Sequence, residues 1–356
     1  MTRVREDVMI PEEHTDAVTR GLREAFGVTA FDDISRLTGG HTSSLVYRLI
    51  VGGSPYVLKI ITRPDDPTRH YTSMRIAAEA GVAPRVWYTN IEDKICITDF
   101  VNVVPLPMSR ALVAFPALLR TLHALPPFAR APFNTTCTFL LNKGPMLDGF
   151  LEKCRTANIL PQAEIEECFT RYAELAAVYP YDDEEMVSSH NDVLKPDNFL
   201  FDGQRVWLAD WEATFLNDRY ADLAVAANLV VGNDEEEAAY LREYFATEPD
   251  HYQRARFHLM QQLSHVFYAM AFLFMSSSGG WTMAQRFRSS PDPAGPIDGT
   301  VPDYAEFRRR VWAREVDLAD NDVKLMYGMV HWRRLSHNVG QPRYREALRI
   351  VAGGRG

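Results

Sequence analysis

Residues 190–198 carry side chains that can handle phosphate and a divalent metal ion. The segment reads HNDVLKPDN, with a carboxylate at Asp192 and an amide at Asn198, and a second carboxylate follows at Asp210. Phosphoryl transfer requires a carboxylate near the attacking hydroxyl and oxygen ligands that hold Mg²⁺ against the phosphates. Mg²⁺ prefers such hard oxygen ligands and keeps several waters. We therefore interpret these three residues as the centre of a metal–phosphate site.

A β-hairpin is expected to bring the parts of this site together. Residues 199–209 consist of two short apolar runs separated by the turn pair Asp202-Gly203. An antiparallel hairpin returns the chain to the end at which it began, so Asp210 should come back beside Asn198. A loop with incidental acids is the alternative, and the required order of elements argues against it.

Lys59 is a second candidate for contact with phosphate. It stands near the end of an apolar strand pattern, residues 56–60, where a buried ammonium is costly unless it meets an anion. A lysine that snorkels from an edge strand is the alternative. The stretch GGHTSS, residues 39–44, precedes this region, and its glycines would let backbone N–H groups approach phosphate closely.

The periodicity of apolar residues predicts a small β-rich part followed by a larger helical part. Pro105, Pro107 and Pro116 mark a linker, and residues 276–303, rich in Ser, Gly and Pro, predict a long surface loop that is either a lid or a disordered insertion. The predicted lobes are 1–101 and 102–356. Strands are expected at 44–51, 56–61, 86–89 and 94–100, and helices at 12–26, 68–80, 110–124, 161–178 and from residue 220 onward.

Composition narrows the classes of function. The chain has 356 residues, 46% of them hydrophobic, which is enough for a packed core, and a net charge of −9 argues against nucleic acid as a partner. That charge suits a neutral or cationic small molecule. No apolar leader and no apolar run of about 20 residues is present, so we expect no membrane span and a cytoplasmic location. The four cysteines form no CxxC pair, as expected in a reducing compartment.

The pattern HxDxxxxN followed by Asp resembles the kinase-like phosphotransferases, specifically the choline/ethanolamine kinase and aminoglycoside phosphotransferase branch. HND at 190–192 with DWE at 210–212 is most similar to bacterial choline-kinase relatives. The resemblance implies an α+β, protein-kinase-like fold with a small β-rich N-lobe and a larger, mostly helical C-lobe. It also implies ATP and Mg²⁺, with transfer of the γ-phosphoryl group to a hydroxyl of a small molecule.

The resemblance also implies roles for individual residues. Asp192 matches the catalytic base, Asn198 and Asp210 match the metal ligands, and His190 and Asp222 match groups that support the catalytic loop. The positions that match contacts to the nucleotide are Lys59, Gly39, Gly40, Thr42, Ser43, Asp99 and Val101.

Two departures from the family pattern are visible. Asn191 stands where protein kinases carry the arginine of HRD, which indicates no control by a phosphorylated activation loop. The family usually places a glutamate on the helix after the lysine strand, but the corresponding stretch, HYTSM, contains no acid. Glu79 is the only candidate to pair with Lys59, and a solvated surface glutamate is the alternative.

Choline kinases hold the quaternary ammonium of their substrate against aromatic rings. Residues 263–271 resemble the helix that supplies two tryptophans in that family, and here those positions are Tyr268 and Ala271. Aromatic residues at helical spacing usually pack inward, which is the alternative reading. The candidates for contact with the acceptor are Tyr268, Tyr304, Trp211, Trp281 and the acidic Glu212.

The acceptor is therefore expected to be choline, ethanolamine or a similar amino alcohol, with an aminoglycoside or sugar hydroxyl as the alternative. A catalytically inactive kinase-like binding module is the alternative of another class. Such modules usually lose the base or a metal ligand, whereas Asp192, Asn198 and Asp210 are all present. A protein kinase is disfavoured because no APE-type segment follows DWE. The oligomeric state is left open by the sequence.

Overall fold

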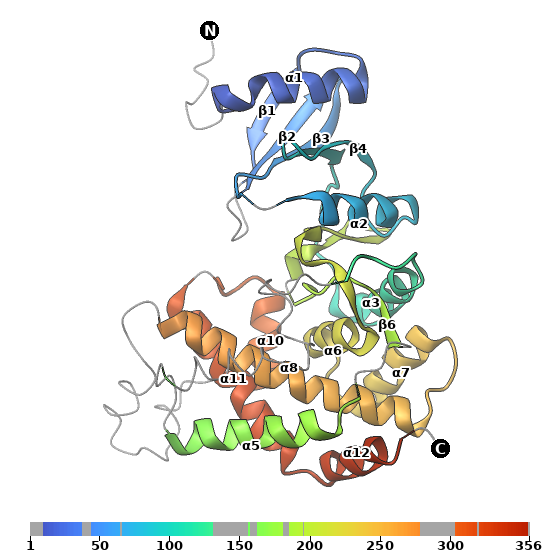
Figure 1. Cartoon of the computed structure of the whole chain (residues 1–356), viewed down its shortest axis with the longest axis vertical. Coiled ribbons are helices and arrows are strands. Elements are labelled where there is room, and N and C mark those ends of the chain that lie inside the picture. Colours follow the sequence, from blue (N-terminus) through green and yellow to red (C-terminus); the bar gives the residue numbers. More distant parts are fainter. Residues whose placement is uncertain are drawn as a thin grey trace.

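The chain folds into a small β-rich lobe above a larger helical lobe, with α2 between them (Figure 1). The computed structural model describes residues 10–37, 44–64, 66–130, 156, 162–180, 185–194, 196–277, 303–318 and 320–354. The expected two-lobe α+β architecture is confirmed in these residues.

The N-terminal lobe is built on an antiparallel sheet of five strands in the order β1-β2-β3-β5-β4. Gly52 and Gly53 join β2 to β3 with φ angles of 56° and 76°, as a two-residue hairpin requires. The turn is thus shorter than predicted, because Ser54 and Pro55 already pair with β2. The strands are β1 (Asp33–Arg36), β2 (Leu45–Val51), β3 (Ser54–Ile60), β4 (Val86–Asn90) and β5 (Ile95–Asp99).

Helix α1 (Glu12–Phe26) packs on β4 and β5 and confirms the prediction for 12–26. Val18 and Leu22 are buried on its inner face, and the helix ends at Gly27, whose φ of 73° is the left-handed cap that favours glycine. Gly21 allows the close approach, because a Cβ there would lie 2.9 Å from the ring of Tyr88.

Helix α2 (Thr68–Glu79) belongs to the hydrophobic core of the helical lobe rather than to that of the sheet. Its buried Tyr71, Met74 and Ala77 join the larger of two hydrophobic clusters, whereas the smaller cluster lies between α1 and the sheet. The backbone N–H of Leu208 also donates to the carbonyl of Val82, directly after α2, at 2.8 Å. The expected lobe boundary near residue 101 stays a prediction, and α2 lies before it although it packs with the helical lobe.

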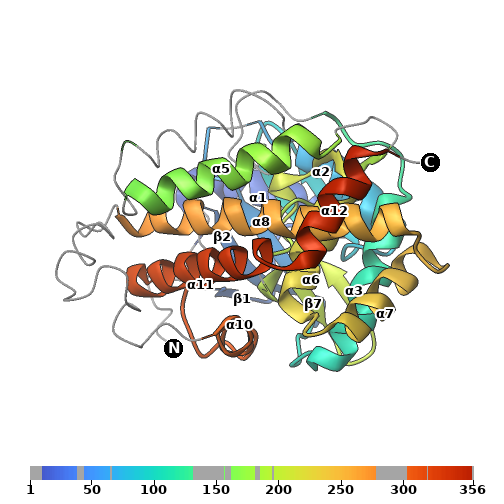
Figure 2. The same ribbon diagram turned by 90° about the horizontal axis from the view of Figure 1, so that it is seen from below.

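The helical lobe is centred on α6, whose side chains are nearly all buried. Helices α5, α8 and α11 run side by side across this lobe (Figure 2). The helices are α3 (Met108–His123), α5 (Gln162–Val178), α6 (Arg219–Val230), α7 (Asp234–Phe245), α8 (His251–Ser277), α10 (Tyr304–Trp312), α11 (Asn321–Val339) and α12 (Pro342–Ala352).

Some details of the helical lobe differ from expectation. Pro116, predicted to mark a linker, lies inside α3 on its buried face. The hairpin of β7 (Phe199–Phe201) and β8 (Val206–Leu208) is present as predicted, but a second antiparallel pair, β6 (Met186–Ser189) with β9 (Phe215–Asp218), was not anticipated. Of the expected loop at 276–303, the first two residues end α8 and Asp303 caps α10, while 278–302 lie outside the described residues. None of the described helices has the length and apolar character of a membrane span.

The crossing of α8 and α11 predicts a sharp effect of one methyl group. A Cβ at Gly328 would lie 2.9 Å from the backbone nitrogen of Leu273, so Gly328→Ala should destabilise the fold by about 1–3 kcal/mol. Gly340→Ala is the matched control, because the nearest atom to its Cβ would be 3.4 Å away and its φ of −75° suits any residue. Equal urea midpoints for the two variants would contradict this packing.

Candidate functional site

The predicted catalytic segment lies between β6 and the β7–β8 hairpin. Phe199 pairs with Leu208 in the hairpin, and the ladder continues one step outward because Ala209 donates its N–H to the carbonyl of Asn198 at 2.9 Å. Asn198 and Asp210 therefore leave the same end of the hairpin, as expected from the sequence.

The side chain of Asn198 holds the loop that carries Asp192. Its Nδ2 donates to the carbonyl oxygen of Asp192 at 2.6 Å and to the carboxylate Oδ2 at 3.0 Å. Both contacts use the amide nitrogen, so the amide oxygen faces the other way and is the atom suited to a metal ion. The arrangement fixes the direction of the Asp192 carboxylate.

Lys59 contacts two carboxylates from the segment that follows the hairpin. Its Nζ lies 3.0 Å from Oδ1 of Asp210 and 2.8 Å from Oε1 of Glu212. Burial alone would lower the pKa of Lys59, but the two carboxylates raise it above its ordinary value, so the ammonium is charged at neutral pH. Because β3 is an inner strand of the sheet, the edge-lysine alternative does not apply.

Glu212 takes the place that the sequence left open for a partner of Lys59. It contacts Lys59 and Arg63, while its backbone carbonyl accepts from Arg69 of α2 at 3.1 Å. Glu79 is exposed at the end of α2. The carboxylate beside the lysine thus comes from the segment after Asp210, and its contacts bind it to cations of the protein itself rather than leaving it to face an amine acceptor.

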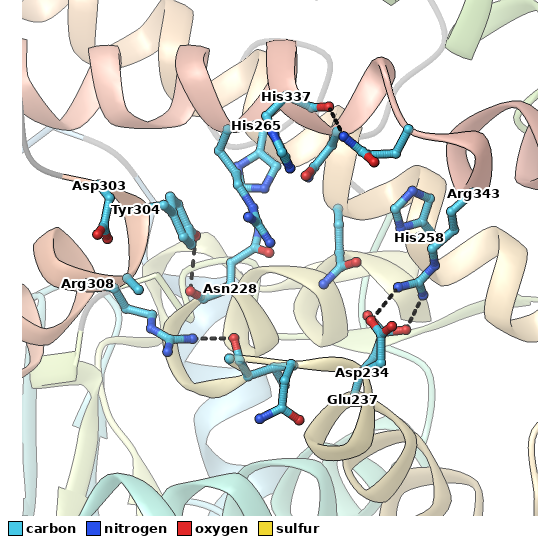
Figure 3. Close-up of a pocket in the computed structure, with 18 of the residues that line it drawn as sticks. Asn228, Asp234, Glu237, His258, His265, Asp303, Tyr304, Arg308, His337 and Arg343 are labelled. Carbon is cyan, nitrogen blue, oxygen red and sulfur yellow. Dashed lines mark hydrogen bonds and ion pairs between the residues drawn. The ribbon is translucent and has the colours of Figure 1, made fainter.

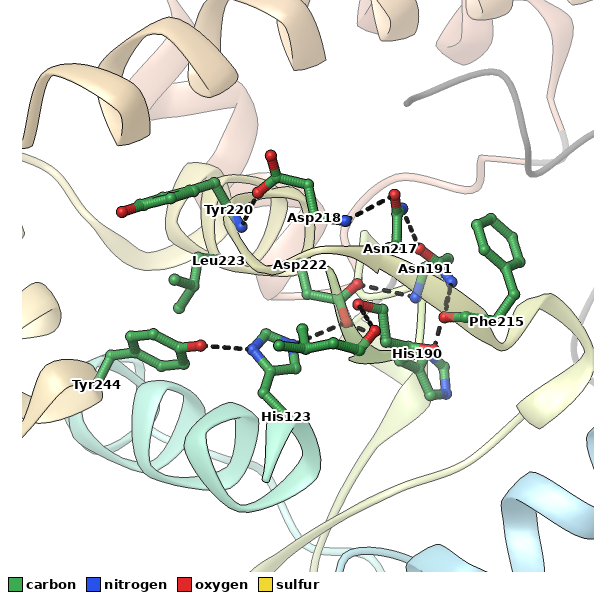
Figure 4. Close-up of polar contacts among 12 residues, drawn as sticks. His123, His190, Asn191, Phe215, Asn217, Asp218, Tyr220, Asp222, Leu223 and Tyr244 are labelled. Atoms are coloured by element: carbon green, nitrogen blue, oxygen red, sulfur yellow. Dashed lines mark hydrogen bonds and ion pairs between the residues drawn. The ribbon is translucent and has the colours of Figure 1, made fainter. Parts of the chain in front are cut away.

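Asp222 of α6 braces the catalytic loop (Figure 4). Only 1% exposed, it accepts the backbone N–H groups of His190 at 2.7 Å and Asn191 at 2.8 Å. Burial alone would raise the pKa of Asp222, but the hydrogen bond and charge of His123, with smaller contributions from His190, lower it below its ordinary value. His123 is in turn 2.7 Å from the hydroxyl of Tyr244. These contacts are consistent with the expected supporting role of Asp222, which stays a prediction.

His190 and Asn191 tie the same loop to the strands around it. Nε2 of His190 donates to the carbonyl of Ala209 at 2.9 Å, one residue before Asp210. Asn191 adopts a φ of 64°, which asparagine tolerates better than most residues, and its amide nitrogen lies 3.1 Å from the carbonyl of Ala213. Its amide oxygen accepts from Asn217. Asn217 and His123 were not identified from the sequence.

Asp210 also has a left-handed backbone, with a φ of 64° and a ψ of 70°. Residues other than glycine rarely adopt this conformation, and it often occurs at functional sites. The conformation turns the chain sharply after β8, so that Asp210 and Glu212 can both reach Lys59. This left-handed conformation of Asp210 could not be predicted from the sequence.

The residues predicted to contact adenine lie at the end of β5. Asp99 is held in place because its carboxylate accepts from the indole of Trp87 at 2.6 Å and its backbone N–H donates to the carbonyl of Arg85 at 2.9 Å. Val101 follows two residues later and is half-buried. Their contact with a nucleotide stays a prediction. The expected phosphate-loop residues and one candidate for the acceptor lie outside the described residues: Gly39, Gly40, Thr42, Ser43 and Trp281.

The aromatic candidates for contact with an amine acceptor pack against the protein. Trp211 is 4% exposed and donates to the carbonyl of Leu208 at 3.2 Å. Tyr268 is 6% exposed and lies among other rings of the helical lobe. Tyr304 donates to the carbonyl of Asn228 at 3.0 Å, and the guanidinium of Arg334 lies 5.6 Å from its ring centroid. These three rings form no open cage for a cation.

A β-sheet lobe joined to a helical lobe by a lysine–carboxylate contact, with an acid and an amide on the loop below, defines the protein-kinase-like class of phosphotransferases. The model of the phosphotransferase enzyme family, APH, matches residues 33–258, and the chain belongs to this family. No curated protein sequence gives a significant match.

Solved structures with the same fold come from both branches expected from the sequence. A choline/ethanolamine kinase family protein from Mesorhizobium loti superposes with a TM-score of 0.60 at 18% identity, covering 96% of this chain and 100% of that one. Choline kinase LicA from Streptococcus pneumoniae gives 0.52 at 16% identity, covering 86% and 99%. APH(2")-IIa in its gentamicin complex gives 0.52 at 14% identity, covering 76% and 92%. At these identities the likeness establishes the fold.

The brace at Asp222 predicts a pH-dependent loss of stability. Asp222→Asn should cost about 1–3 kcal/mol at neutral pH, because an amide cannot accept both backbone N–H groups and leaves one buried donor unpaired. The native pKa of Asp222 lies below the unfolded value of about 3.9, so the wild-type advantage is fully present above that pH and declines as pH falls through the native pKa. Urea unfolding of both proteins at neutral and acidic pH measures this, and a difference that grows toward low pH would contradict it.

Proposed function

We propose that the chain transfers the γ-phosphoryl group of ATP to a hydroxyl of a small molecule, with Asp192 as the base. The observation that carries the proposal is the contact of Asn198 with the Asp192 carboxylate, at the end of the hairpin that also presents Asp210 to Lys59. Membership of the phosphotransferase enzyme family supports the reaction class. A neighbouring structure of LicA in complex with AMP supports the use of an adenine nucleotide.

The residues at the hairpin end suit Mg²⁺. The amide oxygen of Asn198 and the carboxylate of Asp210 are hard oxygen ligands that leave room for waters, as this ion prefers. When bound there, Mg²⁺ would neutralise charge on the nucleotide phosphates. Lys59 supplies a fixed positive charge beside these ligands, and Glu212 holds the ammonium in place.

Asp192 orients the acceptor and receives its proton. The hydrogen bond from Asn198 keeps the carboxylate in one direction, so an approaching hydroxyl meets an oriented acceptor oxygen. The hydrogen bonds from the backbone of His190 and Asn191 to Asp222 hold the loop that carries Asp192. The set of Asp192, Asn198 and Asp210 favours an active enzyme over an inactive binding module.

The acceptor is proposed only as a hydroxyl compound. A choline or ethanolamine acceptor is supported by two structural neighbours, a choline/ethanolamine kinase family protein and a choline kinase, and an aminoglycoside acceptor by a third, which was solved with gentamicin. The aromatic cage expected for choline is not formed by Trp211, Tyr268 and Tyr304, which gives the amine no special support. The cytoplasmic location expected from the sequence stays a prediction.

Replacement of the base tests the proposal most directly. Asp192→Asn should lower kcat by about 10²- to 10⁴-fold, the usual contribution of a general base, while the KM for ATP changes little. The assay is nucleotide consumption with Mg²⁺ against choline, ethanolamine, amino sugars and sugar alcohols. Asp197→Asn is the control, because this residue of the same loop is exposed and pairs with Arg314. Near-normal turnover by Asp192→Asn would show that the base is another group.

The role of Glu212 predicts a different kinetic signature. Glu212→Gln leaves Lys59 with one carboxylate partner instead of two, so the ammonium should be held less firmly and the KM for ATP should rise about tenfold, equivalent to about 1.4 kcal/mol. Glu79→Gln, an exposed glutamate on α2, should leave that value unchanged. If Glu79→Gln raised KM and Glu212→Gln did not, the partner assigned to Lys59 would be wrong.

A further inference from the structure

The helical lobe contains a cavity of about 810 Å³ that the proposed catalysis does not use. Its walls come from α6, α7, α8, α10, α11 and α12 (Figure 3). The volume falls within the range of about 300–1,000 Å³ that is typical of small-molecule sites. Polar side chains from several helices point into it (Figure 3).

Two arginines line this cavity without a carboxylate partner at hydrogen-bond distance in the described part of the chain. Arg308 donates from Nη1 to the carbonyl of Val231, while its buried Nε finds no acceptor there. Arg334 lies over the ring of Tyr304. The pKa of Arg308 is below its ordinary value, mainly because of burial and in smaller part because of the charge of Arg334. Tyr304 and Glu236 act in the opposite direction but do not cancel this effect. Repulsion between two guanidinium groups is relieved by an anion.

Two buried side chains that line the same cavity also have hydrogen-bonding atoms without a partner. Asn228 is 8% exposed and its Nδ2 has no acceptor, and His258 is 6% exposed with neither ring nitrogen bonded, as far as the described residues extend. Burial, with the charges of Arg343 and Arg334, lowers the pKa of His258 to about 3, so the ring is neutral and keeps one N–H donor. Buried polar groups of native proteins are normally paired, so these donors indicate a ligand with acceptor oxygens.

The acids around the cavity are engaged elsewhere. Asp234 and Glu237 both pair with Arg343 (Figure 3). Asp303 accepts a backbone N–H as the cap of α10, and Glu236 accepts one from the loop before α7. The positive charge of the two arginines is therefore not neutralised by a direct ion pair with these groups.

We propose that this cavity binds the anionic group of a small molecule, a phosphate or carboxylate, through Arg308 and Arg334, with Asn228 and His258 as neutral hydrogen-bonding partners. The bound group offers acceptor oxygens to donors that otherwise have none. Binding of an anion here goes beyond the proposed function and does not depend on it; only the role of the ligand as acceptor rests on the proposed function.

The anion site adjoins the catalytic loop. A smaller neighbouring cavity is walled by Leu194, two residues after Asp192, and shares Asn228, Tyr304 and Arg308 with the larger one. A ligand seated there can be the phosphoryl acceptor, as a hydroxy acid or a sugar phosphate, or an effector that acts on the neighbouring loop. The shared chemistry is the anion, and the two sources differ in their kinetics.

Binding of simple anions to the full chain tests the proposal. Inorganic phosphate and citrate, titrated calorimetrically at constant ionic strength, should bind saturably, whereas choline chloride should not. Arg334→Gln should weaken anion binding about tenfold or more, because it removes a charge-assisted contact made by an exposed residue. Arg309→Gln is the matched control, since this neighbour of Arg308 is exposed and pairs with Glu315.

Absence of saturable binding for both anions, or equal affinity in Arg334→Gln and the wild type, would overturn the proposal. Histidine signals in NMR spectra give a second readout, because an anion beside His258 should raise the pKa of its ring, and an unchanged titration of that ring would count against the site.

Assays of nucleotide consumption then distinguish an acceptor from an effector. A hydroxy acid whose KM rises in Arg334→Gln is the acceptor, and phosphate that changes kcat without being consumed is an effector. If the wild-type protein consumed no nucleotide with any of the acceptors, the proposed function would be refuted, while the result on anion binding would stand.

Discussion

The contact of one ammonium group with two carboxylates connects the two parts of this molecule. Lys59 belongs to the sheet, whereas Asp210 and Glu212 follow the hairpin of the helical lobe. Desolvation of a lysine is unfavourable unless an anion compensates, so the sheet and the hairpin stabilise each other's charged groups. The left-handed backbone at Asp210 places that carboxylate pair beside the lysine. The contacts of Asn198 and Asp222 hold the neighbouring loop that carries Asp192.

Much of this arrangement follows from local sequence patterns. The helix at 12–26 ends where Gly27 supplies the left-handed cap. The turn pair Asp202-Gly203 between two apolar runs predicts the hairpin before Asp210. These features depend on residues close together in the chain. Asn198 and Asp210 flank the hairpin in the sequence, so the hairpin alone is enough to bring these expected metal ligands to one end.

Other features depend on contacts between distant segments, which single-sequence patterns do not encode. The strands β6 and β9 are four residues each, and they pair across the whole catalytic segment. The choice of Glu212 over Glu79 as partner of Lys59 depends on where the chain turns after Asp210. Tyr268 and Trp211 have types suited to an ammonium cage, but packing within the helical lobe decides that their rings face other side chains.

The position of α2 determines which part of the molecule can shift as a unit. Its apolar face and the following Val82 are anchored to the helical lobe, although the chain on both sides belongs to the sheet. A rotation of the sheet away from the helical lobe would leave α2 behind once its contacts with β4, such as the hydrogen bond from Arg75 to Thr89, are broken. The backbone would then bend at two short connections, between Ile60 and Thr68 and between Glu79 and Val86, and the lysine would separate from its carboxylates at the same moment.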